Sequence, residues 1–421
     1  MEMKKYKFIS ANEYCVRVFD GTHDSPKPCE KGYKLLTSKN ILAGELDKTS
    51  AYYISENDYN AINQRSQVQQ YDILFSMIGS VGNVCFVKDS NIDFAIKNMG
   101  VFSCENKEKA LYLYYYLQSP FAKKMIDSYL NGAVQKFLGL ERLRNFPILE
   151  YSTDKQKIAA VLSFLDDKIA LNKKINTKLE AMAKRLYDYW FVQFDFPNEE
   201  GKPYKSSGGK MEYNATLKRD IPVGWEVKSI NEVCDVIDCL HSKKPDFCYE
   251  DEDSYLLSLE NITKEGYIDI SEKYYISKKD FSEWTSRICV KENDFLFTNA
   301  GRAGDMGMIP NGIKCAIGRN ITAVRSKKIN PYYLRCFFKS LYMKEQILNN
   351  LDKGCFFMSF NVRSIKQLSI LIPKEENFHK FISFCEPIIK QLNKNNSEIQ
   401  KLTKLRDRLL PLLMNGQVKF N

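Results

Sequence analysis

The sequence is poor in the side chains on which most metal and redox sites depend. It has only three histidines, and its 12 cysteines form no C-x-x-C pair. This argues against both a zinc knuckle and a thioredoxin-like redox motif. The closest pair considered, Cys234 and Cys239, has no nearby set of histidines to complete a metal site. We therefore expect no metal site, and the scattered unpaired cysteines indicate a reducing cytoplasm.

Long apolar runs are absent as well. No stretch approaches the roughly 20 residues that a membrane helix needs. The N-terminus, MEMKKYKFIS, carries charge but lacks the apolar segment of a signal peptide. We expect a soluble cytoplasmic protein without a membrane partner.

Nucleotide-binding and catalytic motifs are also missing. The pair Gly79 and Gly82 follows a strand-like stretch but matches neither G-x-G-x-x-G nor a P-loop, and residues 208–211 lack the leading glycine and the Ser or Thr of a P-loop. No [DN]-P-P-[YFW] tetrapeptide of adenine methyltransferases occurs, and Pro245-Asp246 has no [DE]-x-K partner of a nuclease. We predict no catalytic residue and no bound cofactor.

What the chain does have is size and positive charge. Its 421 residues are too many for one compact core and indicate two or three domains. The formal charge of +10 suits a polyanion such as nucleic acid, because lysines and arginines displace the counterions of phosphates. A mildly basic protein without such a partner explains the charge alone equally well.

Much of the sequence also belongs to an internal repeat. NDFLFTNAGRAGDM (293–306) repeats YDILFSMIGSVGNV (71–84), which pairs Asp72 with Asp294, and the same spacing pairs Arg65 with Arg287 and Ile148 with Ile370. Chance matches do not keep one register over so long a stretch, so we predict a tandem duplication.

We predict an α+β fold with two tandem globular regions, each followed by a long helix. The expected segments are a first globular region at 1–150, a long helix at 151–194, a polar linker at 195–211, a second globular region at 212–374 and a long C-terminal helix at 375–421. Each globular region should hold short strands and one helical run, at 111–130 and at 331–351.

The two long helices carry matching apolar stripes. Residues from Ile158 to Trp190 and from Ile382 to Leu412 recur in alternating steps of four and three, with Asn172, Asn176 and Asn396 in the stripes. One such stripe usually faces a core. Two of them, both with asparagine, predict a coiled-coil pair, since polar seam residues set register and partner. If a pseudo-two-fold axis relates the copies, the pair is antiparallel, and helices of ~60 Å would separate two DNA-reading modules.

Candidate binding residues lie on repeated loops. Asp20-Gly-Thr-His23 recurs as Asp238-Cys-Leu-His241. An Asp three residues before a His indicates either a catalytic dyad or a polar turn that displays the His, and we favour the turn because no nucleophile recurs beside it. The glycine pairs 79/82 and 301/304 indicate hairpin turns or a close approach of the backbone to a ligand.

The loop scaffolds match while their tips differ, with Ser80 in one copy and Arg302 in the other. This is expected of two related readers of different bases, although drift after duplication also produces it. The candidate DNA-contacting residues are Thr22, His23, Lys27, Ser80, Asn83, Gln135, Lys136, His241, Lys243, Lys244, Arg302, Arg319 and Asn320, on loops that turn at Gly79, Gly82, Gly301 and Gly304. Large apolar surfaces usually meet a partner, so the candidates for docking a partner subunit are Leu186, Tyr187, Tyr189, Trp190 and Phe191.

Several of these segments resemble the specificity (S) subunits of type I restriction-modification systems. The strongest is LNKKINTKLEAMAKRLYDYWFVQFDFPNEEGKPYKSSGGKM (171–211), which resembles the central region of that family. DGTHDSPKP (20–28), IPVGWEVKSINEV (221–233), LTKLRDRLLPLLMNGQV (402–418) and the two D-x-L-F-x-x-x-G-x-x-G segments also fit. The first copy lacks the P-x-G-W lead of the second.

The resemblance implies two target recognition domains, each reading one half of a split, asymmetric double-stranded DNA site and held apart by antiparallel helices. It also implies that two methyltransferase (M) subunits dock on the helices and that restriction (R) subunits join them. S-adenosylmethionine, ATP and Mg²⁺ would belong to those partners, and this chain would be non-catalytic. A stand-alone DNA-binding regulator or unpartnered S paralogue, and an enzyme with unfamiliar motifs, remain as alternatives.

Overall fold

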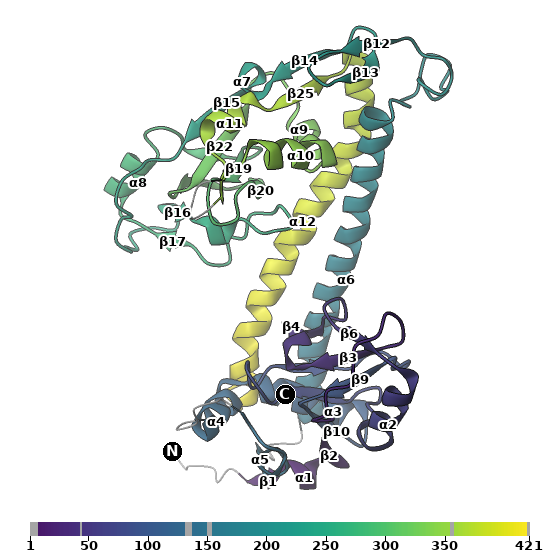
Figure 1. The fold of residues 1–421 in the computed structure, drawn as a ribbon. Helices are drawn as coiled ribbons and strands as arrows, with labels where there is room; N and C mark the ends of the chain where they lie inside the picture. Colours follow the sequence, from purple (N-terminus) through teal and green to yellow (C-terminus); the bar gives the residue numbers. More distant parts are fainter. Residues whose placement is uncertain (1–6, 43, 131–136, 150–153, 354–357, 419–421) are drawn as a thin grey trace. The chain divides into compact units, whose positions relative to one another are not determined.

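The computed structural model describes residues 7–42, 44–130, 137–149, 154–353 and 358–418. The chain divides into two compact units: unit 1 comprises residues 1–168 and 402–421, and unit 2 comprises residues 169–401. Each unit combines a body of strands and short helices with a part of each long helix (Figure 1). The fold is therefore a mixture of helix and strand, as predicted.

Unit 1 is built on a four-stranded sheet of order β2-β10-β7-β8 and a three-stranded sheet of order β6-β3-β9. Its strands are β1 (Phe8–Ser10), β2 (Arg17–Asp20), β3 (Tyr33–Thr37), β4 (Ile41–Leu42), β5 (Glu45–Leu46), β6 (Tyr52–Ile54), β7 (Ile73–Ser76), β8 (Val84–Phe86), β9 (Phe94–Lys97), β10 (Met99–Ser103) and β11 (Pro147–Leu149). Its helices are α1 (Ala11–Tyr14), α2 (Glu56–Ser66), α3 (Lys107–Gln118), α4 (Pro120–Leu130) and α5 (Leu140–Arg144).

Unit 2 repeats this plan with sheets of order β15-β22-β19-β20 and β17-β16-β21-β18. Its strands are β12 (Met211–Asn214), β13 (Arg219–Pro222), β14 (Glu226–Ser229), β15 (Cys234–Asp238), β16 (Tyr255–Leu257), β17 (Tyr274–Tyr275), β18 (Val290–Lys291), β19 (Phe295–Thr298), β20 (Met306–Met308), β21 (Lys314–Ile317), β22 (Ile321–Ser326), β23 (Asp352–Lys353), β24 (Met358–Ser359) and β25 (Ser369–Ile372). Its short helices are α7 (Ile230–Val233), α8 (Lys278–Trp284), α9 (Pro331–Phe338), α10 (Leu341–Asn350) and α11 (Val362–Gln367).

The sheets β2-β10-β7-β8 and β15-β22-β19-β20 agree in strand register as well as in strand order. In unit 1, β10 pairs with β2 so that Gly100 lies opposite Asp20. In unit 2, β22 pairs with β15 so that Thr322 lies opposite Asp238. Since register decides which face every side chain of a strand occupies, the duplicated sequence places equivalent loops at equivalent sheet edges.

One inner strand of each of these two sheets, β7 and β19, is buried on both faces. Phe75 of β7 packs in one hydrophobic cluster and the adjacent Leu74 packs in another. Phe297 and Leu296 of β19 divide in the same way. Successive side chains of a strand point to opposite faces, so a continuous apolar run is the pattern of a sheet covered on both sides.

The predicted single helical run is two helices in each unit. Ser119 separates α3 from α4 with an extended backbone (ψ 151°), and Ser340 separates α9 from α10 in the same way (ψ 158°). The residue before Pro120 is disfavoured in the α conformation, and each serine then caps the second helix by accepting a backbone N–H. The prediction of one run missed this local break.

Two long helices complete the chain: α6 (Lys155–Tyr187), which ends in a π-helical turn η2 (Asp188–Val192), and α12 (Glu375–Met414). Within unit 2 they lie side by side (Figure 1), and their contacts run in opposite order. Trp190 packs on Phe381, whereas Asn172 donates to Glu398 over 3.1 Å.

Asparagines meet between these helices, as polar seam residues do when they set register. Asn176 Nδ2 donates to Asn396 Oδ1, and Asn395 Nδ2 donates to Asn176 Oδ1, both over 2.8 Å. Asn395 is 4% exposed and was not expected in the seam. The buried contact between the two helices therefore includes more positions than the alternating four-and-three pattern predicted.

Candidate nucleic-acid interface

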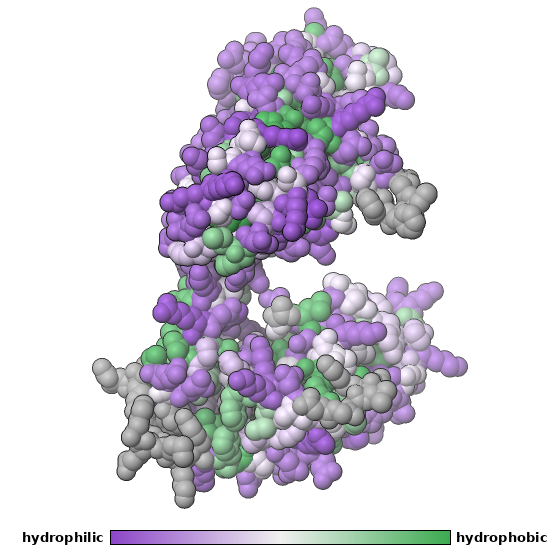
Figure 2. Space-filling view, turned by 90° about the vertical axis from the view of Figure 1, so that its left-hand side faces the viewer, coloured by the Kyte–Doolittle hydropathy of each residue, from purple (hydrophilic) through white to green (hydrophobic). Residues whose placement is uncertain are grey.

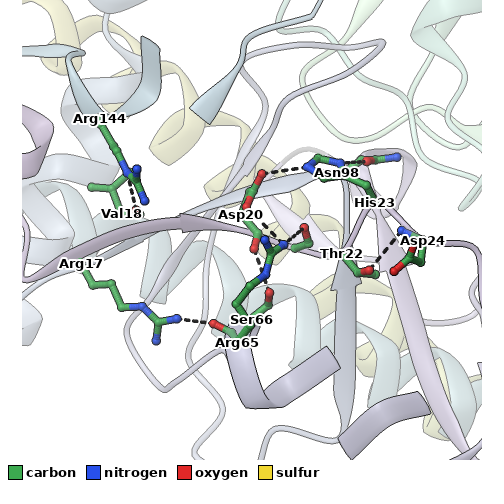
Figure 3. Close-up of polar contacts among 11 residues, drawn as sticks. Arg17, Val18, Asp20, Thr22, His23, Asp24, Arg65, Ser66, Asn98 and Arg144 are labelled. Carbon is green, nitrogen blue, oxygen red and sulfur yellow. Dashed lines mark hydrogen bonds and ion pairs between the residues drawn. The ribbon is translucent and has the colours of Figure 1, made fainter. Parts of the chain in front are cut away.

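The loop after β2, residues 20–23 (the first Asp–His loop), is an ordered polar turn (Figure 3). Asp20 is 6% exposed, and its Oδ2 lies 3.1 Å from Nε2 of the exposed His23. Arg65 holds the loop from α2 by donating to the carbonyl oxygen of Gly21 over 3.0 Å. Asp20 and Asn98 hold the His23 ring, and the Ser66 hydroxyl donates to the main-chain oxygen of Asp20 over 2.9 Å and not to the ring. The geometry therefore favours display of His23 over a catalytic dyad.

The loop after β15, residues 238–241 (the second Asp–His loop), repeats that construction. His241 Nε2 lies 2.8 Å from Asp238 Oδ2. Arg287, the counterpart of Arg65 in the duplication, donates to the carbonyl oxygen of Cys239 over 2.8 Å. Both histidines are thus held at the surface by an aspartate, and both loops are tied down by an arginine from the same place in the repeat.

A second turn accompanies each loop. Asn98, between β9 and β10, has φ 53° and lies with its Oδ1 2.8 Å from His23 Nδ1. Asn320, between β21 and β22, has φ 65°. The left-handed region suits asparagine better than other non-glycine residues, so the sequence itself specifies these turns. Lys97 precedes Asn98, and Arg319 precedes Asn320 in a longer turn.

In unit 2 these elements surround a small hollow of about 170 Å³. Lys244, Arg319 and Asn320 line it together with the buried Trp284. The Lys244 ammonium also lies 3.5 Å from the centroid of the Tyr274 ring, a cation–π contact. Glu260 also lines this hollow, so two cations and an amide accompany one carboxylate there. The excess of positive charge suits an anionic ligand.

The glycine turns, residues 79–82 and 301–304, have nearly identical backbones. Gly79 and Gly301 both have φ 76°, which favours glycine because other residues are strained there. The side chains at the tips of the two turns make different contacts. Arg302 donates to the carbonyl oxygens of Leu259 and Ile262, each over 2.6 Å, so its guanidinium braces the turn and is not simply presented to a ligand.

The remaining predicted contact residues divide by exposure. His23, Lys27, Ser80, Asn83, His241, Lys243, Lys244, Arg319 and Asn320 are exposed. Thr22 is only 9% exposed, so its side chain is less available than predicted, because it accepts from the Asp24 backbone N–H. Gln135 and Lys136 lie outside the described residues.

One group of potential metal ligands within the described ranges was not expected. Asp238, Cys239 and His241 place ligand atoms within 4.8 Å of one another. Cys239 is 1% exposed, and burial raises the pKa of its thiol. Because the thiolate is the form that binds metals, a metal bound here would have to displace the thiol proton.

An ion cluster that sequence reasoning missed joins α6 to the body of unit 2. Glu180 of α6 pairs with Arg335 of α9, a residue that is only 2% exposed, and with Lys339 over 2.9 Å. The Tyr267 hydroxyl donates to the same carboxylate over 2.7 Å. Burial opposes ionisation of Glu180, but Arg335 and Lys339 with these hydrogen bonds outweigh it and lower its pKa to about 2. No local pattern marks four residues so far apart in the chain.

Most of the apolar stretch predicted to dock a partner belongs to the chain's own core. Tyr187, Trp190 and Phe191 are 5%, 3% and 1% exposed. Phe191 packs against Trp225 and Tyr333. Among the five proposed docking residues, only Tyr189 is exposed, at 39%, and Leu186 is partly buried against the same core. The docking hypothesis is reduced to these two.

Replacing Trp190 with alanine should therefore destabilise the isolated chain by about 3–5 kcal/mol, the usual cost of removing a large core aromatic. Tyr189→Ala is the matched control and should change stability by less than about 1 kcal/mol. Urea unfolding of both variants without any partner measures this. A Trp190 variant as stable as the parent chain would show that the ring is not a core residue.

The face of unit 2 seen in Figure 2 is mainly hydrophilic. Purple hydrophilic residues predominate over the visible face of unit 2, with small hydrophobic patches between them (Figure 2). Across the described residues, no helix has both the length and the apolar character needed to cross a bilayer.

Known proteins share these features. A family model for the type I restriction modification DNA specificity domain matches residues 27–181 and again residues 222–404. The type I restriction enzyme MjaIX specificity subunit of Methanocaldococcus jannaschii is 26% identical over 315 residues, covering 73% of this chain and 69% of that protein. The HindI specificity subunit of Haemophilus influenzae is 22% identical over 317 residues, covering 63% and 67%. The crystal structure of a type I S subunit from M. genitalium has the same fold, with a TM-score of 0.58 at 14% identity over 98% of this chain and 97% of that one.

Proposed function

Since this chain belongs to the family of type I restriction-modification DNA specificity subunits, we propose that each of its two globular bodies reads one half of a bipartite, asymmetric DNA site. The family match falls on two segments, one for each copy of the repeat. The chain acts as the specificity subunit of its system and has a non-catalytic role in recognising DNA.

The observation that carries this proposal is that the two units have the same backbone arrangement but different side chains on their loops. The strand registers, the Asp–His loops and the glycine turns recur in both units. The side chains on them change: the exposed Ser80 is replaced by Arg302, which braces its turn, and the exposed Asn83 is replaced by Asp305. Base edges are distinguished by side chains in the grooves, whereas the backbone of DNA is the same everywhere. Two readers of different half-sites require this combination.

The long helices are proposed to set the distance between the readers and to carry the partner subunits. α6 has 33 residues and α12 has 40, which correspond to ~50 and ~60 Å at the rise of an α-helix. Two M subunits and the R subunits would supply S-adenosylmethionine, ATP and Mg²⁺ chemistry. Tyr189, exposed at the end of α6, is the residue of the predicted docking set that best suits such a contact.

Exchanging residues 1–150 for the same region of a related subunit tests this function. The exchange should alter the bases of one half-site and leave the other half and the gap unchanged, because each body contacts its half independently. Mapping of methylated sites in cells that carry the M subunit measures the result. The reciprocal exchange of residues 212–374 is the control and should alter the other half. Simultaneous change of both halves after either exchange would refute two separate readers.

A further inference from the structure

Resting on the proposed function, we propose that the two Asp–His loops and the turns beside them grip the DNA sugar–phosphate backbone and do not read bases. The bases would then be read by the positions at which the two units differ.

The two copies share the geometry of the Asp–His loop as well as its residue types. Asp20 and Asp238 occupy the same register in their sheets. Each aspartate holds a histidine three residues later, over 3.1 and 2.8 Å. Each loop also receives a hydrogen bond from an arginine at the same place in the repeat.

The two units have to contact half-sites that are alike only in part. Two half-sites of different sequence share no fixed set of base edges, but both present the same phosphates and sugars. A side-chain arrangement held alike in both units therefore matches the part of the ligand that is alike in both half-sites. A base-reading arrangement would have had to change with the bases.

The chemistry of the loops agrees with a phosphate ligand. The first loop is accompanied by Lys27 and Lys97, and the second by Lys243, Lys244 and Arg319. The carboxylate of Asp20 is 8% exposed and faces His23 and Arg65. Asp24 is an exposed acid beside the first loop, and Asp246 and Glu260 are exposed acids beside the second. The two cations of the first loop and the three of the second still outnumber them. Cations that approach phosphates release counterions, which makes binding sensitive to salt.

Two of the positions at which the units differ lie near the second Asp–His loop in the sequence. Cys29 and Cys248 donate their backbone N–H to equivalent carbonyl oxygens, those of Tyr53 over 2.9 Å and Tyr275 over 3.1 Å. The residues on either side differ: Pro28 and Glu30 in unit 1 are replaced by Phe247 and Tyr249 in unit 2. These two rings are 61% and 58% exposed. They belong with the base readers, because exposed aromatic rings can pack on bases or thymine methyl groups.

The test uses the full chain assembled with its M subunit. Lys97→Gln and Arg319→Gln each remove one proposed phosphate contact, and Lys124→Gln, on the exposed face of α4, is the matched control. DNA affinity is measured over a series of salt concentrations, and methylated sites are mapped for each variant. We expect both test variants to methylate the parent sequence, to bind all sites less tightly, and to show a salt slope smaller by about 1. The control should show neither change.

A Phe247→Ala variant supplies the opposite signature, which is relaxed choice of bases in the unit 2 half-site with an unchanged salt slope. The proposal would be overturned if Lys97→Gln or Arg319→Gln changed the recognised bases, or if both left affinity and salt slope as in the parent. Failure of the proposed function looks different, since the parent complex itself would then methylate no bipartite sequence.

Discussion

A Glu180→Gln chain should unfold about 3–5 kcal/mol more easily than the parent, the usual cost of removing one partner from a buried ion pair. The substitution keeps the shape of the side chain but leaves Arg335, which is 2% exposed, beside Lys339 without a counter-charge. All three tryptophans, Trp190, Trp225 and Trp284, lie in unit 2. Their fluorescence during urea unfolding therefore follows the unit in which the change was made.

A second glutamate on a long helix provides the control. Glu386 pairs with Lys390 over 2.7 Å at the surface of α12, and exposed pairs of this spacing contribute less than about 1 kcal/mol. Glu386→Gln should therefore unfold almost as the parent does. If the two glutamine variants lost equal stability, the Glu180 cluster would not hold unit 2 together in the way its burial indicates.

The same cluster predicts a dependence on pH. Because the pKa of Glu180 falls from an ordinary value of 4.5 to about 2 on folding, its ionised form stabilises the fold above pH 4.5. That stabilisation is lost as the pH falls from 4.5 towards 2, which amounts to about 3 kcal/mol. The parent and Glu180→Gln should therefore converge in stability over this range. A difference that stays constant down to pH 2 would contradict the lowered pKa.

Lengthening both long helices by four residues should lengthen the unread gap of the DNA site by about two base pairs. Four residues add ~6 Å to a helix, and base pairs are ~3.4 Å apart. The inserts belong after Leu171 in α6 and after Ile399 in α12. Insertion in α6 alone shifts the seam and should cost stability.

Methylated-site mapping decides this prediction as well. The bases of both half-sites should stay as they are, because neither globular body is altered, while the number of bases between them increases. A matched variant with four residues inserted at Gly208, outside both helices, should keep the parent gap. An active double-insertion variant that also kept the parent gap would show that the helices do not measure the distance.

The sequence by itself determined the features that depend on neighbouring residues. The repeat predicted two similar bodies. Turns with a positive φ form at Gly79, Gly301, Asn98 and Asn320, which are residue types that tolerate this conformation. The Asp–His loops were predicted as polar turns because no nucleophile recurs beside them in the sequence. The aspartate and the histidine, three residues apart, do lie within reach of each other in both loops. The breaks at Ser119 and Ser340, between α3 and α4 and between α9 and α10, also depend on neighbouring residues. They were not predicted, because the apolar pattern continues across them.

Only the tertiary structure decided which side chains are free to act. Arg302 was expected at the ligand surface, yet it braces its own turn through Leu259 and Ile262. Trp190 looked like an exposed docking residue until α12 brought Phe381 against it. Glu180 and Arg335 are distant in sequence and carry no shared motif. The physical reason is the same in each case, because burial and pairing depend on which distant segments pack together. The amphipathic spacing of a helix predicts that one of its faces is covered, but it does not identify the segment that covers it.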